Sequence, residues 1–350
     1  MPNDVLTKAI DAAASGRDLS ADQAQEVLAE IMGGRVGEVQ TAAFLIALRT
    51  KGETVEELTG LARTMRELAV PVAAAGDDLL DTAGTGGGVS TFNVSTTAAF
   101  VAAGAGCRVA KHGNRSATSL CGSADLLEAL GARIDLDAAA VAHCIDEVGF
   151  GFMFAPAHHG ATKHVVPVRK DLGVRTIFNF LGPLTNPAGA TRQLIGVSDL
   201  AYLDVIAGAL VELGARRAAV VSSEDGMDEI SVGADTRLLE VTPAGVTAHT
   251  VSPESVGLER ADLEQVTGGT PERNAEIARA VLGGEPGARR SLVVLNAGAA
   301  MFVADRAASF EEGVRLAEQT IDSGAALATM ESFVSKTREL AQEEVVEHAR

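Results

Sequence analysis

The sequence of 350 residues predicts an α/β protein, in which a small all-helical domain precedes a larger domain whose mostly parallel sheet has helices on both faces. Three observations predict this arrangement. The first 70 residues carry only helical signals, a proline and a glycine break the periodicity within 70–76, and short apolar runs then alternate with helical segments. We therefore expect a helical domain over residues 1–70 and an α/β domain over 77–350.

Capping boxes mark two helix starts in the first domain, because a hydroxyl and a side chain three residues later can cap the first turn. Ser20 with Gln23 precedes one apolar stripe, and Thr54 with Glu57 precedes another. The spacing of apolar residues predicts helices near 4–14, 20–32, 38–50 and 54–69. The segment 70–76 is expected to be a linker that can act as a hinge.

The second domain begins as a βαβ unit, with a strand at 79–82, a glycine loop, a helix of small residues at 95–103 and a strand at 107–110. Further helices are expected near 125–130, 202–213, 271–282, 291–303, 310–328 and 331–347. Further strands are expected near 151–154, 218–222, 236–241 and 246–250.

The composition disfavours several classes of function. The 29 Lys and Arg against 47 Asp and Glu give a net charge of −18, which repels nucleic acid, and the aromatic content of 3% leaves few rings to stack on bases. The three cysteines form no CxxC pair, so neither a disulfide framework nor a zinc site is indicated. Neither a signal-peptide pattern nor an apolar run of membrane-spanning length is present, so we expect a cytoplasmic protein that binds no membrane.

The glycine-rich segment 81–96 is the first with chemical character. It leaves a strand and enters a helix whose first turn offers Asn93, Ser95 and Thr96, so that N–H groups and hydroxyls converge where a phosphate can sit. The segment matches neither a Walker A loop nor the GxGxxG pattern, which disfavours nucleoside triphosphates and dinucleotides. A flexible glycine turn is the alternative interpretation.

The polar segment 111–119 follows the second strand of the βαβ unit and holds two cations, an imidazole, an amide and three hydroxyls. Ligands of parallel sheets bind at the carboxyl ends of the strands, so this segment favours a small polyanionic ligand. A solvated basic loop is the alternative. Gly122 and Ser123 lead into a further helix N-terminus that could aim donors at the same place.

The segment 154–187 contains His158, His159 and His164, but no fourth ligand at zinc spacing accompanies them. A pocket wall is therefore favoured over a metal site. Arg169 could pair through both its terminal nitrogens with a substrate carboxylate, and an ordinary surface arginine is the alternative.

The acidic segment 224–230 comes directly after the expected strand at 218–222. Asp228 and Glu229 offer hard oxygen ligands, which suit Mg²⁺ when substrate phosphates complete its coordination. In a chain of this charge, a solvated acidic loop is the alternative.

Taken together, these segments closely resemble the anthranilate phosphoribosyltransferases of tryptophan biosynthesis. The runs Lys-His-Gly-Asn-Arg at 111–115 and Gly-Pro-Leu-Thr-Asn-Pro at 182–187 are highly specific to that family, and the likeness extends over nearly the whole chain. It implies helical excursions from about 155–187 into the helical domain and a Mg²⁺-dependent homodimer. It also implies transfer of a phosphoribosyl group from 5-phosphoribosyl 1-diphosphate to the amine of anthranilate, with release of diphosphate.

The resemblance also implies which residues form the site. Those expected around the phosphoribosyl diphosphate are Gly84, Gly87, Gly88, Asn93, Val94, Ser95, Thr96, Lys111, Gly113, Asn114, Arg115, Ser116, Ala117, Thr118, Ser119 and Ser123. Those expected near anthranilate are His112, Asn114, Ala155, Pro156, His159 and Arg169, of which His112 and Arg169 are expected to be catalytic. Those expected to serve Mg²⁺ are Ser95, Asp228 and Glu229.

Two positions depart from the family pattern. Gly88 stands where the family commonly has an acidic residue, in a loop one residue shorter, and Thr162 stands where some relatives have Tyr near the anthranilate entrance. They leave open a divergent member that acts on another aromatic acid, or a silent homologue that binds nucleic acid or a regulatory ligand. A pyrimidine nucleoside phosphorylase is a third alternative, against which the run at 111–115 counts.

The expected mechanism is displacement at the anomeric carbon of the ribose through an oxocarbenium-like transition state. Mg²⁺, loop amides and Lys111 would neutralise the leaving diphosphate. His112 would serve as a weak acceptor of the amine proton. Closure of the domains about the linker would exclude water.

Overall fold

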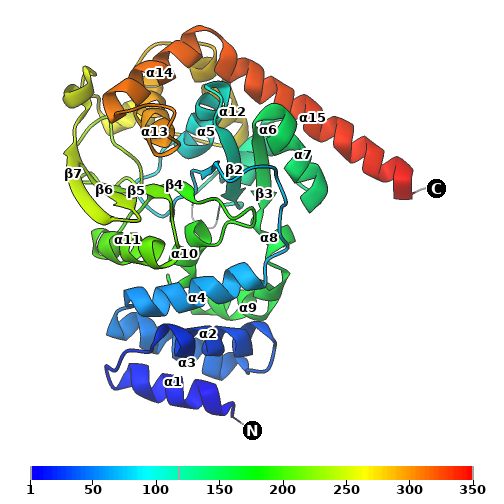
Figure 1. Ribbon diagram of the computed structural model, residues 1–350, viewed down its shortest axis with the longest axis vertical. Coiled ribbons are helices and arrows are strands. Elements are labelled where there is room, and N and C mark those ends of the chain that lie inside the picture. Colours follow the sequence, from blue (N-terminus) through cyan, green and yellow to red (C-terminus); the bar gives the residue numbers. More distant parts are fainter. Residues whose placement is uncertain (1, 117–118, 349–350) are drawn as a thin grey trace.

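The computed structural model describes residues 2–116 and 119–348, and in it the N-terminal segment forms a helical bundle (Figure 1). Its helices are α1 (Asp4–Ala14), α2 (Ala21–Met32), α3 (Glu38–Lys51) and α4 (Val55–Glu67). Both expected capping boxes are present, at Ser20 with Gln23 and at Thr54 with Glu57. Residues 70–76 form neither helix nor strand.

A seven-stranded sheet forms the centre of the rest of the chain, in the order β3-β2-β1-β4-β5-β6-β7. The strands are β1 (Leu79–Asp81), β2 (Arg108–Gly113), β3 (Phe150–Phe154), β4 (Arg192–Gly196), β5 (Arg217–Ser223), β6 (Thr236–Thr242) and β7 (Gly245–Val251). Strands β1 to β5 pair in parallel, whereas β6 and β7 add an antiparallel hairpin at one edge. The expectation of a mostly parallel sheet is confirmed.

Helices cover both faces of this sheet (Figure 1). They are α5 (Val94–Gly104), α6 (Ser123–Leu130), α7 (Ala138–Val148), α11 (Leu203–Glu212), α12 (Pro271–Leu282), α13 (Ala288–Val303), α14 (Phe310–Asp322) and α15 (Ala325–His348). No helix among the described residues combines the length and the apolar character needed to cross a membrane.

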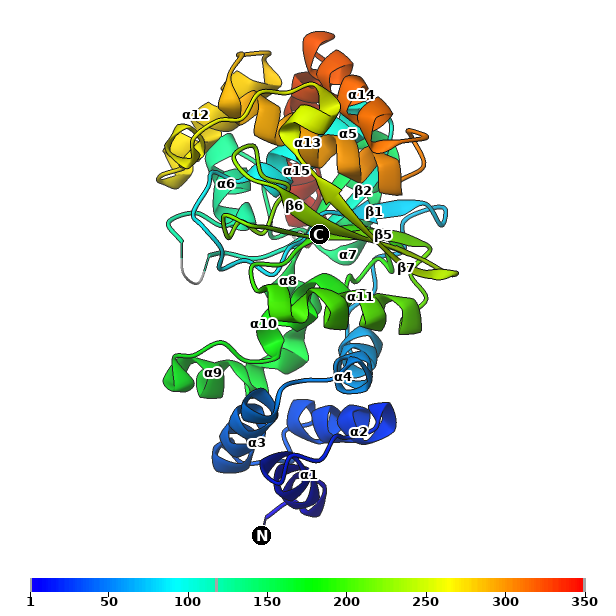
Figure 2. The ribbon, with the colours of Figure 1, turned by 90° about the vertical axis from the view of Figure 1, so that its left-hand side faces the viewer.

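Short helices between β3 and β4 extend toward the N-terminal bundle. They are α8 (Ala155–His158), α9 (Val166–Leu172) and α10 (Phe178–Leu181). Helix α9 contacts α3 and helix α10 contacts α4, and Figure 2 shows α9 beside the bundle. We call the stretch 155–187 the excursion.

Three expectations about elements were incomplete or wrong. The sequence prediction missed α7 and β4. It also placed a helix boundary near residues 328–331, whereas the helical axis breaks at Ser323 and Gly324, where Gly324 adopts a left-handed conformation with φ of 77°. A glycine at this position ends α14, because glycine adopts positive φ without the steric cost of a Cβ atom.

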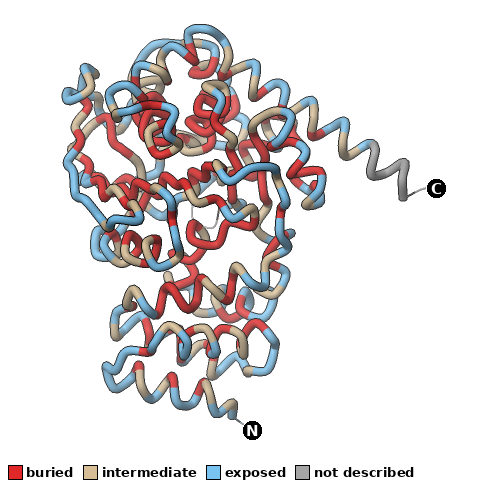
Figure 3. Tube along the Cα trace, in the orientation of Figure 1, coloured by how far each residue is buried: buried red, intermediate tan, exposed pale blue. Residues whose placement is uncertain are grey.

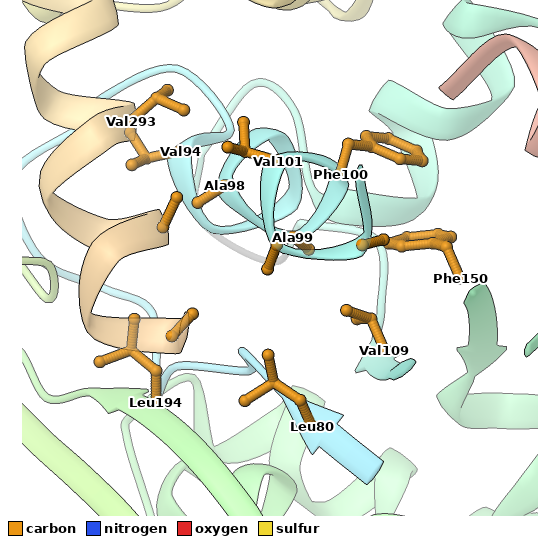
Figure 4. Packing of buried hydrophobic residues seen from close by; sticks show 14 of the residues in the cluster. Leu80, Val94, Ala98, Ala99, Phe100, Val101, Val109, Phe150, Leu194 and Val293 are labelled. Atoms are coloured by element: carbon orange, nitrogen blue, oxygen red, sulfur yellow. The ribbon is translucent and has the colours of Figure 1, made fainter. Parts of the chain in front are cut away.

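Two apolar clusters lie on opposite faces of the sheet, and Figure 3 shows the buried residues gathered around it. On β5, Ala219 and Val221 join one cluster and Val220 joins the other, because successive side chains of a strand point to opposite faces. In the first cluster, shown in Figure 4, Phe100 of α5 stacks on Phe150 of β3 at 4.3 Å between ring centroids. The second cluster is continuous from the sheet through α11 into the N-terminal bundle.

Candidate active site

A cleft of about 640 Å³ lies at the carboxyl ends of the parallel strands, where such sheets bind ligands. Its walls come from segments that are far apart in the sequence: the glycine loop after β1, the end of β2, the excursion, and the acidic loop after β5. The four segments singled out from the sequence therefore meet in one place.

The glycine loop, residues 82–93, is held against the sheet and the acidic loop by backbone contacts. The Thr85 N–H donates to the Gly196 carbonyl at 2.8 Å, and the Val89 N–H donates to the Gly226 carbonyl at 3.1 Å. Gly86 has φ of 66°, and its N–H donates to Oδ2 of Asp228 at 2.9 Å. The loop thus has a definite shape that depends on glycine, which disfavours a featureless flexible turn.

Helix α5 begins at the end of this loop, and within the described structure no side chain caps its first turn. Free N–H groups there favour an anion in the cleft. Asn93 already has several partners, since its Oδ1 accepts from Nδ2 of Asn274 at 2.8 Å and its Nδ2 donates to the Cys121 carbonyl at 3.1 Å. Thr96 is fully buried and donates to Oγ of Ser123 at 3.1 Å, so it joins α5 to α6.

Lys111 is a buried cation beside the glycine loop. Its Nζ donates to Oγ1 of Thr82 at 2.9 Å and to Oγ of Ser95 at 3.3 Å. Burial lowers the pKa of Lys111 to about 8, and the nearby carboxylates of Asp81 and Glu229 oppose this shift. Because the hydrogen-bond partners of this ammonium group are neutral oxygens, the group is suited to a polyanionic ligand.

A buried network holds β1, β2 and the excursion together behind Lys111. Asp81 accepts hydrogen bonds from the His112 N–H at 3.2 Å and from Nδ2 of Asn186 at 2.7 Å. The same Asn186 nitrogen donates to the Ala110 carbonyl at 2.8 Å. Asn186 belongs to the motif at 182–187, so this part of the motif positions the strand that carries Lys111 and His112.

His112 lines the cleft with one ring nitrogen unpartnered among the described residues. Its Nδ1 donates to the Gly182 carbonyl at 3.1 Å, which leaves Nε2 as the acceptor. Burial lowers the pKa of His112 to about 3, and the neighbouring His159, whose ring centroid is 5.0 Å away, adds to the effect. The imidazole is therefore neutral near pH 7 and is a hydrogen-bond acceptor much more than a base.

The buried histidines His112 and His159 predict acid sensitivity. Burial also lowers the pKa of His159 to about 4, with a further contribution from His158. A histidine in the unfolded chain has a pKa near 6.5, so below that pH the unfolded chain binds more protons than the folded chain does. Stability is therefore lost as the pH falls from 6.5 toward the folded-state pKa values of about 4 for His159 and about 3 for His112. Each of the two groups should remove about 1.4 kcal/mol of unfolding free energy between pH 7.5 and 5.5.

Urea unfolding at these two pH values measures the effect, and the loss in the variant His159→Asn should be about 1.4 kcal/mol smaller than in the wild-type protein. His249→Asn on β7 is the control, because its side chain is 47% exposed. A His159→Asn protein with the full wild-type loss would contradict the assignment.

The loop that follows β2 is organised by the first turn of α6. Arg115 donates from Nη1 to Asp125 and from Nη2 to Glu128, both at 2.9 Å, and its guanidinium lies over the Phe154 ring. Asp125 also accepts from the Gly122 N–H at 2.8 Å. These contacts place the polar loop at the cleft, and most of the Arg115 charge is already compensated.

Asp228 and Glu229 line the cleft side by side and are partly exposed to it. Burial raises the pKa of both carboxyl groups, and for Glu229 the charge of Asp228 raises it further. The residue after Glu229 is Ile230, and Asn296 of α13 forms two hydrogen bonds with its backbone. The Asn296 Oδ1 accepts from the Ile230 N–H and the Asn296 Nδ2 donates to the Ile230 carbonyl, each at 3.0 Å. Two adjacent carboxylates held in this way favour a divalent cation.

The two carboxylates are suitable ligands for Mg²⁺, and they leave most of its coordination positions to other ligands. Within residues 2–116 and 119–348, no group of three His, Cys, Asp or Glu side chains is placed to hold a metal ion. The described side chains of the cleft therefore do not form a complete metal site by themselves. Two carboxylates opposite a phosphate-binding loop fit Mg²⁺ that shares its coordination with a substrate.

The departure at Gly88 has a structural counterpart. A Cβ atom at this position would lie 2.6 Å from the Gly226 carbonyl oxygen and 3.1 Å from Oδ1 of Asp228. The short glycine loop therefore packs directly on the acidic loop, and an acidic side chain at 88 has no room in this arrangement.

Arg169 of α9 reaches the cleft from the excursion. Among the described residues, its guanidinium has no hydrogen bond or ion pair, and it lies over the Phe178 ring at 5.3 Å from the centroid. Burial lowers its pKa. A partly buried guanidinium without a counter-ion is expected to bind an anionic group of a ligand. Thr162, the second departure, uses its hydroxyl within the excursion, donating to the His159 carbonyl at 2.6 Å.

Most predicted site residues meet in the cleft. Those that line it are Gly84, Gly87, Gly88, Asn93, Val94, Ser95, Lys111, His112, Gly113, Asn114, Arg115, Ser116, Ser119, Ser123, Arg169, Asp228 and Glu229. Thr96, Ala155, Pro156 and His159 are not among the lining residues, and their contact with a substrate stays a prediction. Ala117 and Thr118 lie outside the described residues.

The cleft also contains residues that the prediction did not assign to it, chiefly Arg175, Phe178, Asn179 and Asn296. The first three flank the motif at 182–187, so their closeness to that motif was a usable signal. Asn296 lies in an apolar helical stretch of α13, and nothing in its local sequence indicates the cleft.

Two family models match the chain. One, described as the α/β domain of a glycosyl transferase family, matches residues 76–327. The other, described as the helical bundle domain of a glycosyl transferase family, matches residues 7–69.

The matching relatives are anthranilate phosphoribosyltransferases. The one from Symbiobacterium thermophilum is 53% identical over 331 residues, which cover 94% of this chain and 97% of that protein. The crystal structure of the Thermus thermophilus enzyme is 47% identical, with a TM-score of 0.90 over 94% of this chain and 99% of that one. The enzyme from Saccharomyces cerevisiae in complex with PRPP and Mg is 27% identical, with a TM-score of 0.88 over 95% and 98% of the two chains.

Proposed function

The chain belongs to the anthranilate phosphoribosyltransferase family of glycosyl transferases, and from this premise we propose how its cleft transfers a phosphoribosyl group to anthranilate in tryptophan biosynthesis. The donor is 5-phosphoribosyl 1-diphosphate. The bond from C1 of the ribose to the diphosphate breaks, a bond from C1 to the anthranilate nitrogen forms, and one amine proton passes to the released diphosphate or to water.

The glycine loop and Lys111 bind the donor. The N–H groups in the uncapped first turn of α5 face the anion, and the Lys111 ammonium stands beside Ser95 on the same wall of the cleft. Because these donors are fixed before the donor arrives, they stabilise the charge that develops on the leaving diphosphate at little cost in reorganisation.

Asp228, Glu229 and Ser95 would serve the magnesium ions that accompany the diphosphate. When bound, Mg²⁺ supplies neutralisation of the charge on the leaving group. The chain contributes the alignment of the acidic pair: the Gly86 N–H donates to Asp228, and Asn296 holds the backbone of Ile230, the residue after Glu229.

Arg169 binds the carboxylate of anthranilate, and its unpartnered guanidinium in the cleft is the observation that carries this assignment. The Phe178 ring supports the guanidinium from one side, so that its fork is directed toward the ligand. A neutral arylamine is already nucleophilic and needs no strong base. His112 accepts a hydrogen bond from the amine at Nε2 and thereby orients the nitrogen lone pair toward C1.

We further propose that the enzyme is a cytoplasmic homodimer. Val39 and Ile46 lie seven residues apart on one face of α3, and they are 84% and 37% exposed. Val166 at the start of the contacting helix α9 and Val174, two residues beyond its end, are also exposed. This apolar face is suited to a second copy of the chain, and light scattering should give twice the mass of one chain. All three cysteines are buried and free, as suits a reducing compartment.

The function is tested by mixing the protein with Mg²⁺, 5-phosphoribosyl 1-diphosphate and anthranilate. The loss of anthranilate fluorescence then measures the reaction. The fluorescence should fall only when all three are present. A protein that consumes another aromatic acid instead would be a divergent member of the family. Consumption of neither, together with binding of single-stranded DNA, would identify a silent homologue.

A further inference from the structure

Arg175 is a cleft residue that stands between the excursion and the glycine loop, and the mechanism above does not use it. It lies in the turn between α9, which carries Arg169, and α10, which begins with Phe178. Its position in the chain therefore connects it to the acceptor side of the cleft, whereas its side chain reaches the donor side.

The two terminal nitrogens of Arg175 form two hydrogen bonds, one directly to the glycine loop and one to Ser198, which follows β4. Nη2 donates to the Gly86 carbonyl at 3.1 Å, and Nη1 donates to Oγ of Ser198 at 2.9 Å. Ser198 in turn donates to the same Gly86 carbonyl at 2.9 Å. Since the Gly86 N–H donates to Asp228, the backbone of this one residue joins the Arg175 fork, Ser198 and a carboxylate of the acidic pair.

The neighbouring Gly87 confirms how closely the guanidinium approaches the loop. Gly87 has φ of 81°, and a Cβ atom there would lie 2.7 Å from Nη1 of Arg175. The loop adopts a left-handed conformation at the point where the guanidinium packs on it. The loop shape and the position of Arg175 are thus mutually dependent.

The other contacts of Arg175 lead into the helical part of the molecule. Its carbonyl accepts from Nη1 of Arg49 on α3 at 2.9 Å, and its guanidinium lies over the Phe180 ring at 5.4 Å from the centroid. Phe180 stacks on Tyr202 at 3.8 Å, and the Tyr202 hydroxyl donates to Oε2 of Glu53 at 2.6 Å. A continuous series of contacts therefore joins α3 and the α3–α4 connection to the glycine loop.

We propose that Arg175 couples the two substrate sites, so that binding at the acceptor side through Arg169 favours the loop conformation that binds the donor, and the reverse. Arg175 is on this view a positioning residue, and the coupling depends on its two-point fork rather than on its charge alone. The proposal rests on the function proposed above. Because coupling is reciprocal, each substrate must raise the affinity for the other by the same factor.

The test measures the dissociation constant of 5-phosphoribosyl 1-diphosphate by calorimetry with Mg²⁺ present. It is measured once without benzoate and once with saturating benzoate, and the ratio of the first value to the second gives the coupling. Benzoate has the carboxylate that Arg169 would bind but no amine, so no transfer occurs. The wild-type protein should bind the donor at least about fivefold more tightly with benzoate present. In Arg175→Lys, which keeps the charge but loses the fork, the ratio should fall to about one.

Two further variants refine the test. Ser198→Ala removes one arm of the contact without touching the arginine and should reduce the ratio below the wild-type value. Arg237→Lys is the matched control, because Arg237 forms an exposed ion pair with Asp204 outside the cleft, and it should keep the wild-type ratio. Thermal unfolding of each variant confirms that it is folded, and Ser198→Ala keeps the test valid if Arg175→Lys is not.

A wild-type ratio of one, or an Arg175→Lys protein that keeps the wild-type ratio, would overturn the proposal. These outcomes are distinct from failure of the proposed function, in which the wild-type protein would not consume anthranilate at all. Initial rates provide a second readout: Arg175→Lys should raise the KM for both substrates, although the residue is assigned to neither binding set.

Discussion

Mg²⁺-dependent turnover should fall roughly 10²–10³-fold in the double variant Asp228→Asn, Glu229→Gln, which corresponds to about 3–4 kcal/mol of lost transition-state stabilisation. The amide side chains keep the shape of the acidic pair, and an asparagine oxygen can still accept from the Gly86 N–H. What they remove is the negative charge that holds the cation against the leaving diphosphate. Loss of anthranilate fluorescence over a Mg²⁺ titration measures the effect.

The matched control is Glu224→Gln in the same loop, because Glu224 is exposed and does not line the cleft. It removes a negative charge close by in the sequence and should keep nearly full activity. If the double variant were as active as Glu224→Gln at every Mg²⁺ concentration, the acidic pair would have no part in the reaction.

The second large effect is expected at Arg169. Arg169→Gln should lower kcat/KM for anthranilate roughly 10–150-fold, since a hydrogen bond to a charged group contributes about 1.5–3 kcal/mol. The KM for 5-phosphoribosyl 1-diphosphate, measured at saturating anthranilate, should change much less. Arg169→Lys should lie between the two, because an ammonium keeps the charge but cannot form the two parallel bonds of a guanidinium.

Lys170→Gln provides the comparison for Arg169, since Lys170 is the next residue on α9 and lies outside the cleft. Its kinetic constants should match those of the wild-type protein. A raised donor KM in Arg169→Gln, with an unchanged anthranilate KM, would assign the guanidinium to the wrong substrate.

Local signals predicted much of this fold. The capping boxes at Ser20 and Thr54 are complete within four residues, so the sequence alone reveals them. Strand β4 was missed because all five of its residues are buried, including Arg192 and Gln193, so that neither an alternating pattern nor a long apolar run marks it. A buried arginine of this kind depends on tertiary partners: Arg192 pairs with Asp305, which is 113 residues away.

The site could be predicted where its chemistry is concentrated in short segments, as in the glycine loop and the run at 111–115. It could not be predicted where a residue acts through a distant partner. The amide of Asn296 holds Ile230 across 66 positions of the sequence. The same limit applies to His112, whose residue type suggests a base but whose burial lowers its pKa to about 3.

The second apolar cluster, which extends from the sheet through α11 into the N-terminal bundle, has a consequence for the folding of the chain. Leu58 of α4 and Val220 of β5 belong to the same cluster, in which α11 packs on β5 and α4 packs on α11. A polypeptide that begins after the linker would expose the apolar surface of α11 that α4 covers, and it would tend to aggregate. The two segments matched by separate family models therefore fold as one unit, and neither is expected to be stable alone.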